Sequence, residues 1–264
     1  MSDLQPNSEP TEQNTAPPPP EVEELEGIVC ICDALGARSF SIARSREVLR
    51  KMGLLVDTVT KIEALMHDTV TRARIDTEYS GLNVADAKIF TFGDTLLYAW
   101  PIDSESQWTQ SVSRFSLWAN ALVLTSLALE LPIRGCFTYG KYLVKEDRNI
   151  VLGPAVTDAA GWYDRAKWIG MHSTPHMKIM MESRIESDKD KWLDHLVSYD
   201  VPLSTGIMKL WCPRWPDNSA TDPPPNDKSG ILRTLSKLHF SPKDADKYMN
   251  TLAFIEHVFA EHEE

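Results

Sequence analysis

Two aspartates stand at positions where acidic side chains can do chemistry. Asp33 ends a short apolar run, and Asp94 follows Gly93 at the tip of a predicted hairpin over 87–100. A Gly-Asp pair between two apolar runs is a hairpin signal. If the two strands are neighbours, both carboxylates project from one sheet edge and suit Mg²⁺ or Mn²⁺ holding a polyphosphate. The alternative is structural, because aspartate is common in turns, where it accepts hydrogen bonds from backbone amides.

The segments around these aspartates alternate between strands and long helices. Apolar residues at three- and four-residue steps predict the helices, and glycine and proline predict where elements end. This alternation predicts an α/β or α+β sandwich. In chain order, we expect strand 28–32, helix 39–74 with a break at Gly53, hairpin 87–100, helix 105–131, strand 133–141, strand 150–152, helix 153–170, strand 208–211 and helix 241–261.

Composition restricts the possible partners. The chain has 264 residues and a net charge of −11, which argues against nonspecific nucleic-acid binding and against an anionic membrane surface. No apolar run has the length of a membrane span, and the acidic N-terminus is unlike a signal peptide. The four cysteines lack metal or redox spacing, so buried thiols in a reducing cytosol are expected. These features predict a cytoplasmic protein.

Two proline-rich segments divide the chain. Residues 1–26 are acidic, proline-rich and nearly devoid of apolar side chains, which predicts a disordered tail. Residues 213–229 hold five prolines and predict a linker. A core domain over 27–212 and a helical C-terminal extension over 230–264 remain.

The order of four motifs resembles the class III nucleotidyl cyclases, the family of adenylyl and guanylyl cyclase catalytic domains. The resemblance covers roughly 27–172 and implies an α+β, ferredoxin-like domain with a mostly antiparallel central sheet and helices packed on it, here followed by a C-terminal helix. The motifs are Cys32-Asp33-Ala34-Leu35-Gly36, Phe92-Gly93-Asp94, Arg134-Gly135 with Gly140, and Gly153-Pro154-Ala155-Val156.

Three positions depart from the family pattern. Phe90 stands where purine cyclases carry a base-reading lysine, and Thr157 and Gly161 replace an asparagine and a transition-state arginine. The chain looks closest to the bacterial pyrimidine cyclases of Pycsar antiphage systems, which make cyclic UMP or cyclic CMP. Two other interpretations stay open: an inactive cyclase-like module that binds a nucleotide or a partner, and an adenylyl cyclase with altered base contacts.

The resemblance assigns a role to each candidate residue. It implies that Asp33, Asp94 and the Ala34 carbonyl hold two divalent cations, Mn²⁺ or Mg²⁺. Arg38 and Arg165 are the candidates to replace the missing arginine, with ordinary helix-surface charges as the alternative. The nucleotide-binding residues expected are Ala34, Leu35, Gly36, Ala37, Arg38, Phe90 and Arg134.

The resemblance also implies a partner. Class III active sites are shared between two catalytic domains, so one domain per chain implies a homodimer with a nucleoside triphosphate substrate. Four tryptophans are possible interface anchors, with core packing as the simpler explanation for each: Trp100, Trp118, Trp162 and Trp168.

Overall fold

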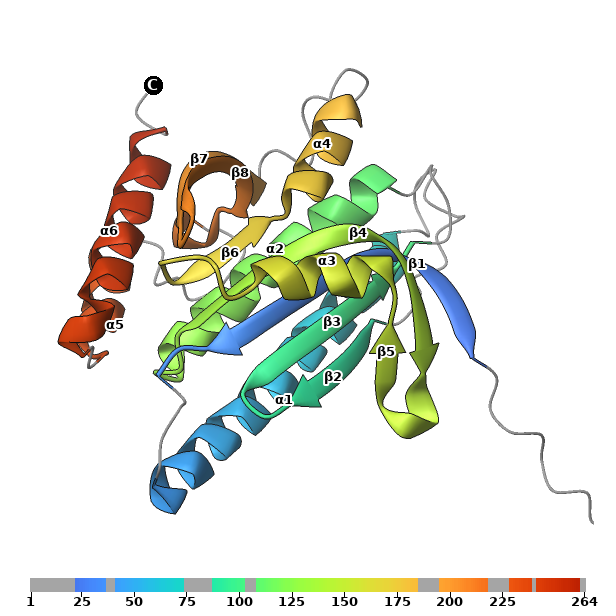
Figure 1. The fold of residues 1–264 in the computed structure, drawn as a ribbon, viewed down its shortest axis with the longest axis horizontal. Coiled ribbons are helices and arrows are strands. Elements are labelled where there is room, and N and C mark those ends of the chain that lie inside the picture. Colours follow the sequence, from blue (N-terminus) through green and yellow to red (C-terminus); the bar gives the residue numbers. More distant parts are fainter. Residues whose placement is uncertain are drawn as a thin grey trace, which may run out of the picture.

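The protein folds around one six-stranded sheet, with a separate two-stranded sheet beside it (Figure 1). The structure is a computed structural model. It describes residues 22–36, 41–73, 87–102, 108–184, 195–217, 228–238 and 241–261. The sheet is mostly antiparallel and carries helices on both faces, which confirms the predicted α+β class.

Strand β1 lies at the centre of the large sheet. It pairs antiparallel with β3 on one side and with β4 on the other, and β2 forms the edge beyond β3. The far half of β4 pairs with β5, whereas its first residues pair in parallel with β6. The strands are β1 (Glu23–Ala34), β2 (Lys88–Phe92), β3 (Thr95–Pro101), β4 (Ile133–Lys145), β5 (Ile150–Leu152) and β6 (Gly170–Ser173).

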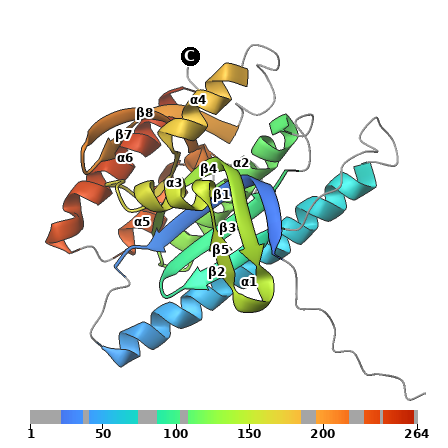
Figure 2. The ribbon, with the colours of Figure 1, turned by 45° about the vertical axis from the view of Figure 1, so that its right-hand side comes forward.

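The two faces of the sheet are covered differently (Figures 1 and 2). Helices α1 (Ile42–Ala73) and α2 (Trp108–Ala128) cover one face, and alternate β1 residues such as Cys30 and Cys32 point into that core. Among the described helices, the short helix α3 (Pro154–Trp162) is the one that covers the other face, where it packs on Val29 and Ile31. Because strand side chains alternate between faces, Asp33 shares the α3 face.

The C-terminal part packs onto the α1/α2 side of the molecule. Phe254 stacks edge-on against Trp168, and the N–H of Ile169 donates to Thr251 Oγ1 at 2.9 Å. The extension is therefore joined to the same apolar core. The remaining elements are α4 (Pro175–Arg184), β7 (Leu196–Leu203), β8 (Gly206–Pro213), α5 (Lys228–Ser236) and α6 (Ala245–Ala260), with 3₁₀ turns over 146–148, 215–217 and 242–244.

Several sequence-based boundaries are wrong. β1 begins at Glu23, inside the predicted tail, because its first residues pair with the far half of β4. α1 continues through Gly53 without a break, and α3 ends at Trp162, well before 170. The predicted linker 213–229 begins at the last residue of β8 and includes the buried Trp215, and its residues 218–227 lie outside the described part of the chain.

The tryptophans proposed as interface anchors and the four cysteines can be compared with their burial in the core. Trp100, Trp118 and Trp168 are at most 2% exposed, so they are core residues and not interface anchors. All four cysteines are free and buried, as predicted, and burial raises the pKa of Cys32 to about 12. Within the described residues, no helix is long and apolar enough to cross a membrane.

Candidate functional site

Asp33 lies near the end of the central strand on the sparsely covered face. Asp33 as a whole residue is only 9% exposed. A carboxylate at that depth is costly unless positive charge or donors surround it. The position therefore calls for a cationic partner.

Asp94 is the immediate neighbour of that position across the strands. It follows Gly93, whose φ of 64° forms the tight turn between β2 and β3. Thr95, the next residue, pairs with Asp33 across the ladder. The N–H of Ala34 donates to the backbone carbonyl of Asp94 at 3.1 Å. The structure thus brings the two predicted aspartates together at one end of two adjacent strands.

Arg134 supplies positive charge at the same place. It pairs with Asp33 across β1 and β4, and its Nη2 lies 3.5 Å from Asp33 Oδ2. Its Nη1 donates to the carbonyl oxygens of Asp164 at 2.6 Å and Ala166 at 3.3 Å. The guanidinium is therefore held by the loop after α3. Its contact with Asp33 is long for a charge-assisted hydrogen bond, which leaves room for competition by another anion.

The donors in this region suit a hard divalent cation. Two carboxylates and the Ala34 carbonyl are oxygen ligands, and Mg²⁺ and Mn²⁺ bind through few protein oxygens together with substrate phosphates and water. Across the described residues, no group of three or more His, Cys, Asp or Glu side chains could hold a metal ion. The residues therefore fit a cation bound jointly with a ligand, and they do not fit a closed structural metal site.

The turn after Asp33 is only partly free to bind phosphate. The Ala34 N–H is engaged by Asp94, and the Leu35 N–H donates to the Pro132 carbonyl at 2.7 Å. Gly36, with φ of 73°, lets the chain reverse direction there. Ala37 and Arg38 lie outside the described residues. Of the described turn residues, the N–H of Gly36 is the donor left for a phosphate.

Phe90 contributes to an apolar recess on the same face. The residue is 7% exposed and belongs to the core beneath α3, so it is both a core residue and part of the recess wall. The recess has a volume of about 310 Å³ and lies between the β2–β3 and β4–β5 hairpins. Sequence reasoning missed the β4–β5 contribution, because the pairing of β5 with β4 is not visible in either segment alone. The lining residues are Ile31, Phe90, Thr91, Phe92, Thr95, Leu97, Asn149, Ile150 and Val151.

Helix α3 carries two of the three positions that depart from the pattern of the cyclase motifs, Thr157 and Gly161, and Arg165 follows the helix. Thr157 and Gly161 are exposed. Arg165 Nε donates to the Gly161 carbonyl at 2.6 Å, and its guanidinium lies 5.8 Å from the centre of the Trp162 ring. The side chain is thus folded back on the helix end. A catalytic role would require it to leave these contacts.

A buried polar cluster fixes α3 on the sheet. Asp158 Oδ2 accepts hydrogen bonds of 2.7 Å from both Thr138 Oγ1 and Thr174 Oγ1. Because these residues come from α3, β4 and the segment before α4, the cluster holds the helix that faces the site. Sequence reasoning missed Asp158, although an aspartate one position after Thr157 in a largely apolar segment is a visible signal.

Known proteins resemble this chain only in structure. No protein-family model and no curated protein matches the sequence. One similar solved structure is the catalytic core of a rhodopsin-guanylyl cyclase with converted specificity, in complex with ATPαS. The two chains are 15% identical in sequence, the match covers 74% of this chain and 98% of that chain, and the TM-score is 0.42. The adenylyl cyclase CyaB from P. aeruginosa is similar with 11% identity, 73% and 95% coverage, and a TM-score of 0.42. Likenesses this distant assign no activity to this chain.

Proposed function

We propose that this protein is a metal-dependent nucleotide cyclase that converts UTP or CTP into the 3′,5′-cyclic monophosphate and pyrophosphate. In this reaction the ribose 3′-oxygen forms a bond to the α-phosphorus, and the bond from that phosphorus to the β-phosphate oxygen breaks. The 3′-hydroxyl loses its proton, and pyrophosphate leaves. Catalysis of this kind depends mainly on positioning and charge neutralisation.

The observation that carries this proposal is the meeting of Asp33 and Asp94 on adjacent strand ends with Arg134 beside them. The two carboxylates together carry a formal charge of −2, and the Arg134 guanidinium, 3.5 Å from Asp33 Oδ2, carries +1. A dication that also binds a triphosphate would balance them. This arrangement therefore favours a ligand-dependent cation site over a structural turn.

Each residue has a distinct task in this proposal. Asp33, Asp94 and the Ala34 carbonyl would hold Mg²⁺ or Mn²⁺, which lowers the pKa of the 3′-hydroxyl and neutralises phosphate charge when bound. Arg134 would turn its Nη2 from Asp33 to a phosphate oxygen, since a guanidinium matches phosphate geometry. Gly36 would donate its backbone N–H to a phosphate.

The base preference is inferred from the recess around Phe90. Its wall offers aromatic and aliphatic faces together with the hydroxyls of Thr91 and Thr95, and the described residues that line it include no lysine to contact a purine ring. These features support a pyrimidine base. We further propose that the cyclic product is a second messenger in bacterial antiviral defence and that the enzyme acts in the cytoplasm, on the resemblance to the Pycsar cyclases.

A homodimer with shared active sites completes the proposal. Large apolar side chains are exposed around the recess, including Phe92 at 87% and Ile150 at 45% exposure. Such side chains at the tips of two neighbouring hairpins mark a surface suited to another protein. A second copy would cover them and close the site.

The test is incubation with each of the four nucleoside triphosphates and Mn²⁺, followed by separation of the products. We expect a cyclic pyrimidine nucleotide and pyrophosphate from the unmodified protein, and at least a 100-fold loss in Asp94→Ala, because metal-held charge contributes several kcal/mol. Asp200→Ala is the matched control, since Asp200 is exposed on the separate two-stranded sheet. Absence of a cyclic product from all four substrates would sink the proposal.

A second candidate function is a non-catalytic module that binds a nucleotide or a partner. The observation that favours it is the state of α3, where Thr157 and Gly161 replace the expected polar pair and Arg165 is bound to the helix end. Such a protein would bind a triphosphate without forming product. An adenylyl cyclase with altered base contacts is separated by the same assay, because ATP would then give the cyclic product.

A further inference from the structure

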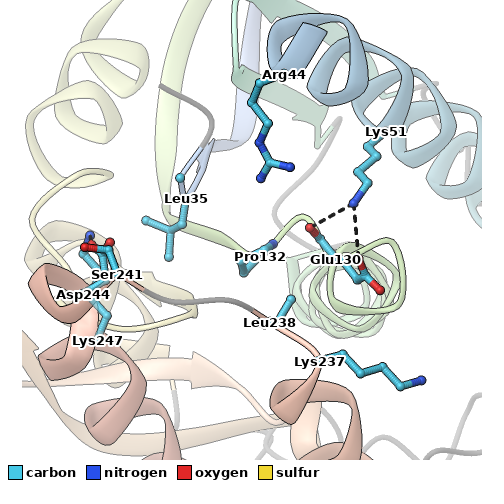
Figure 3. A pocket seen from close by; sticks show the side chains of 11 residues that line it. Leu35, Arg44, Lys51, Glu130, Pro132, Lys237, Leu238, Ser241, Asp244 and Lys247 are labelled. Carbon is cyan, nitrogen blue, oxygen red and sulfur yellow. Dashed lines mark hydrogen bonds and ion pairs between the residues drawn. The ribbon is translucent and has the colours of Figure 1, made fainter. Parts of the chain in front are cut away.

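A cavity of about 500 Å³ lies between the sheet domain and the C-terminal extension (Figure 3). One wall comes from α1 and the turn after β1, a second from the turn between α2 and β4, and a third from residues 237–238 and 241–247. This size is in the range of small-molecule sites. The lining residues are Leu35, Gly36, Arg44, Lys51, Glu130, Pro132, Lys237, Leu238, Ser241, Asp244 and Lys247.

The lining carries an excess of positive charge. Its four cationic side chains face two carboxylates, Glu130 and Asp244, and Glu47 pairs with Arg44 and Lys51 from outside the lining, which leaves one positive charge in excess. The chain as a whole has a net charge of −11. Two of the cations, Arg44 and Lys51, come from the sheet domain, and two, Lys237 and Lys247, come from the extension (Figure 3). Cations from distant parts of an acidic chain are thus gathered around one space.

Lys51 is the buried member of this group. The residue is 8% exposed, and its Nζ lies 3.4 Å from the Glu130 carbonyl oxygen, 3.6 Å from Glu130 Oε2 and 3.3 Å from Glu47 Oε1. Charge-assisted hydrogen bonds are normally about 2.7–2.9 Å long. All three contacts of this ammonium with the described residues are longer than that, so its donors are not fully used by them. An anion in the cavity would complete its environment.

The other cations keep donors for a ligand. Arg44 uses Nη1 to bind Glu47 Oε2 at 2.9 Å, and no described residue accepts from its Nη2. Lys237 is exposed, and its Nζ makes no ion pair or hydrogen bond with a described residue. Lys247 is paired with Asp244 at 2.6 Å. Ser241 Oγ accepts from the Lys243 N–H at 3.1 Å, which leaves its hydroxyl proton to donate.

We propose that this cavity is a second anion site, which binds a small molecule through a diphosphate or triphosphate group. An arginine fork, ammonium groups and a serine hydroxyl are the donors that phosphates use in proteins. The cavity uses none of Asp33, Asp94 and Arg134, although it shares the turn residues Leu35 and Gly36 with the proposed cyclase site. It lies on the side of that turn toward α1, whereas Asp33 lies on the α3 face. The inference does not rest on the proposed cyclase activity.

The test is titration calorimetry of the full chain with inorganic pyrophosphate and with UTP, in EDTA so that no divalent cation takes part. We expect binding that weakens as salt is raised. The double variant Lys237→Gln, Lys247→Gln should weaken binding about 10- to 100-fold, as expected for two lost charged contacts. Lys243→Gln is the matched control, because Lys243 lies in the same segment but does not line the cavity.

Two further comparisons locate the site and its ligand. Equal affinities for pyrophosphate and UTP would assign recognition to the phosphates alone, and tighter UTP binding would add the nucleoside; both agree with the inference. Arg134→Met should leave this binding unchanged. Failure of both probes to bind, equal effects of the double variant and Lys243→Gln, or loss of binding only in Arg134→Met would overturn it.

Discussion

Asp94→Asn should abolish the stabilisation of this protein by Mn²⁺ while leaving the fold intact. Asp94 is half-buried at the β2–β3 turn, and the contact that it makes with Ala34 uses its backbone carbonyl. Asparagine keeps the shape of the side chain and removes one charge from the carboxylate pair. Hence the substitution removes a metal ligand without removing the hydrogen bond that holds the turn.

The size of the effect follows from the donor set. Two carboxylates with no third acidic, histidine or cysteine ligand among the described residues predict weak binding, with a Kd on the order of 1 mM. At about 10 mM Mn²⁺, ligand linkage then stabilises the folded state by about 1.4 kcal/mol. For a domain of this size, that free energy corresponds to a rise in Tm of about 3–6 °C.

The measurement is thermal unfolding with and without Mn²⁺ for the unmodified protein, Asp94→Asn and Asp200→Asn. We expect the Mn²⁺-dependent rise in Tm in the unmodified protein and in Asp200→Asn, and no rise in Asp94→Asn. If Asp94→Asn kept the full rise, or if Asp200→Asn lost it, the cation would bind elsewhere and the reasoning about the strand ends would be refuted. The readout needs no turnover, so it holds for the non-catalytic candidate as well.

Three other predictions address the fold, the pH response and the assembly. Gly135→Ala should lower the free energy of unfolding by about 2–3 kcal/mol in urea denaturation, because the added Cβ would lie 2.4 Å from the Ile31 carbonyl oxygen. Gly161→Ala is the control: its Cβ would meet no atom within 4 Å, and the substitution should stabilise α3 by about 0.5–1 kcal/mol. Burial lowers the pKa of His172 to about 4 from its usual 6.5. In that pH range the unfolded chain binds a proton that the folded protein does not, so about 3 kcal/mol of the free energy of unfolding is lost as pH falls from 6.5 to 4. Denaturation at several pH values should show that His172→Gln reduces this loss. Phe92→Asp should shift the oligomeric state toward monomer in analytical ultracentrifugation, whereas Ile207→Asp, at a 75% exposed position on the β7–β8 hairpin, should not.

The centre of the fold could be predicted from the sequence because its signals are local. The apolar run before Asp33 and the Gly93-Asp94 tip each specify a strand end without reference to the rest of the chain. The pairing of β1 with β3 then places both aspartates together. The β4 segment was found for the same reason, since its glycines and apolar residues follow a helix that ends before Pro132.

The end of α3 could not be predicted because contacts from distant segments decide it. The N–H of Lys167 donates to the Pro202 carbonyl, and the N–H of Ser204 donates to the Arg165 carbonyl, both at 2.8 Å. These bonds to the end of β7 take the chain out of helical geometry after Trp162. The apolar residues that follow, Trp168 among them, continue a helical pattern in sequence but are buried in a loop and a strand. Local periodicity carries no information about that choice.

The prediction of where β1 begins was wrong for a related reason. Glu23 and Glu24 have no apolar pattern, yet they extend the strand because β4 continues past the core and offers partners there. Lys88 lies 3.3 Å from Glu23, and Lys141 lies 3.1 Å from Glu24. Exposed ion pairs of this kind contribute little, so the backbone pairing with β4 is the main cause. A strand that depends on its neighbour's length cannot be recognised from its own composition.

The charge distribution connects the two proposed sites. A chain with a net charge of −11 repels a triphosphate at long range, so any site for one must concentrate positive charge locally. On the α3 face the chain offers Arg134 and a carboxylate pair, which needs dications before it can accept phosphate. In the cavity between the sheet domain and the C-terminal extension, the chain offers four cationic side chains, which can bind phosphate without a metal ion. Removal of divalent cations should therefore distinguish the two sites: phosphate binding on the α3 face should be lost in EDTA, whereas phosphate binding in the cavity beside the C-terminal extension should persist.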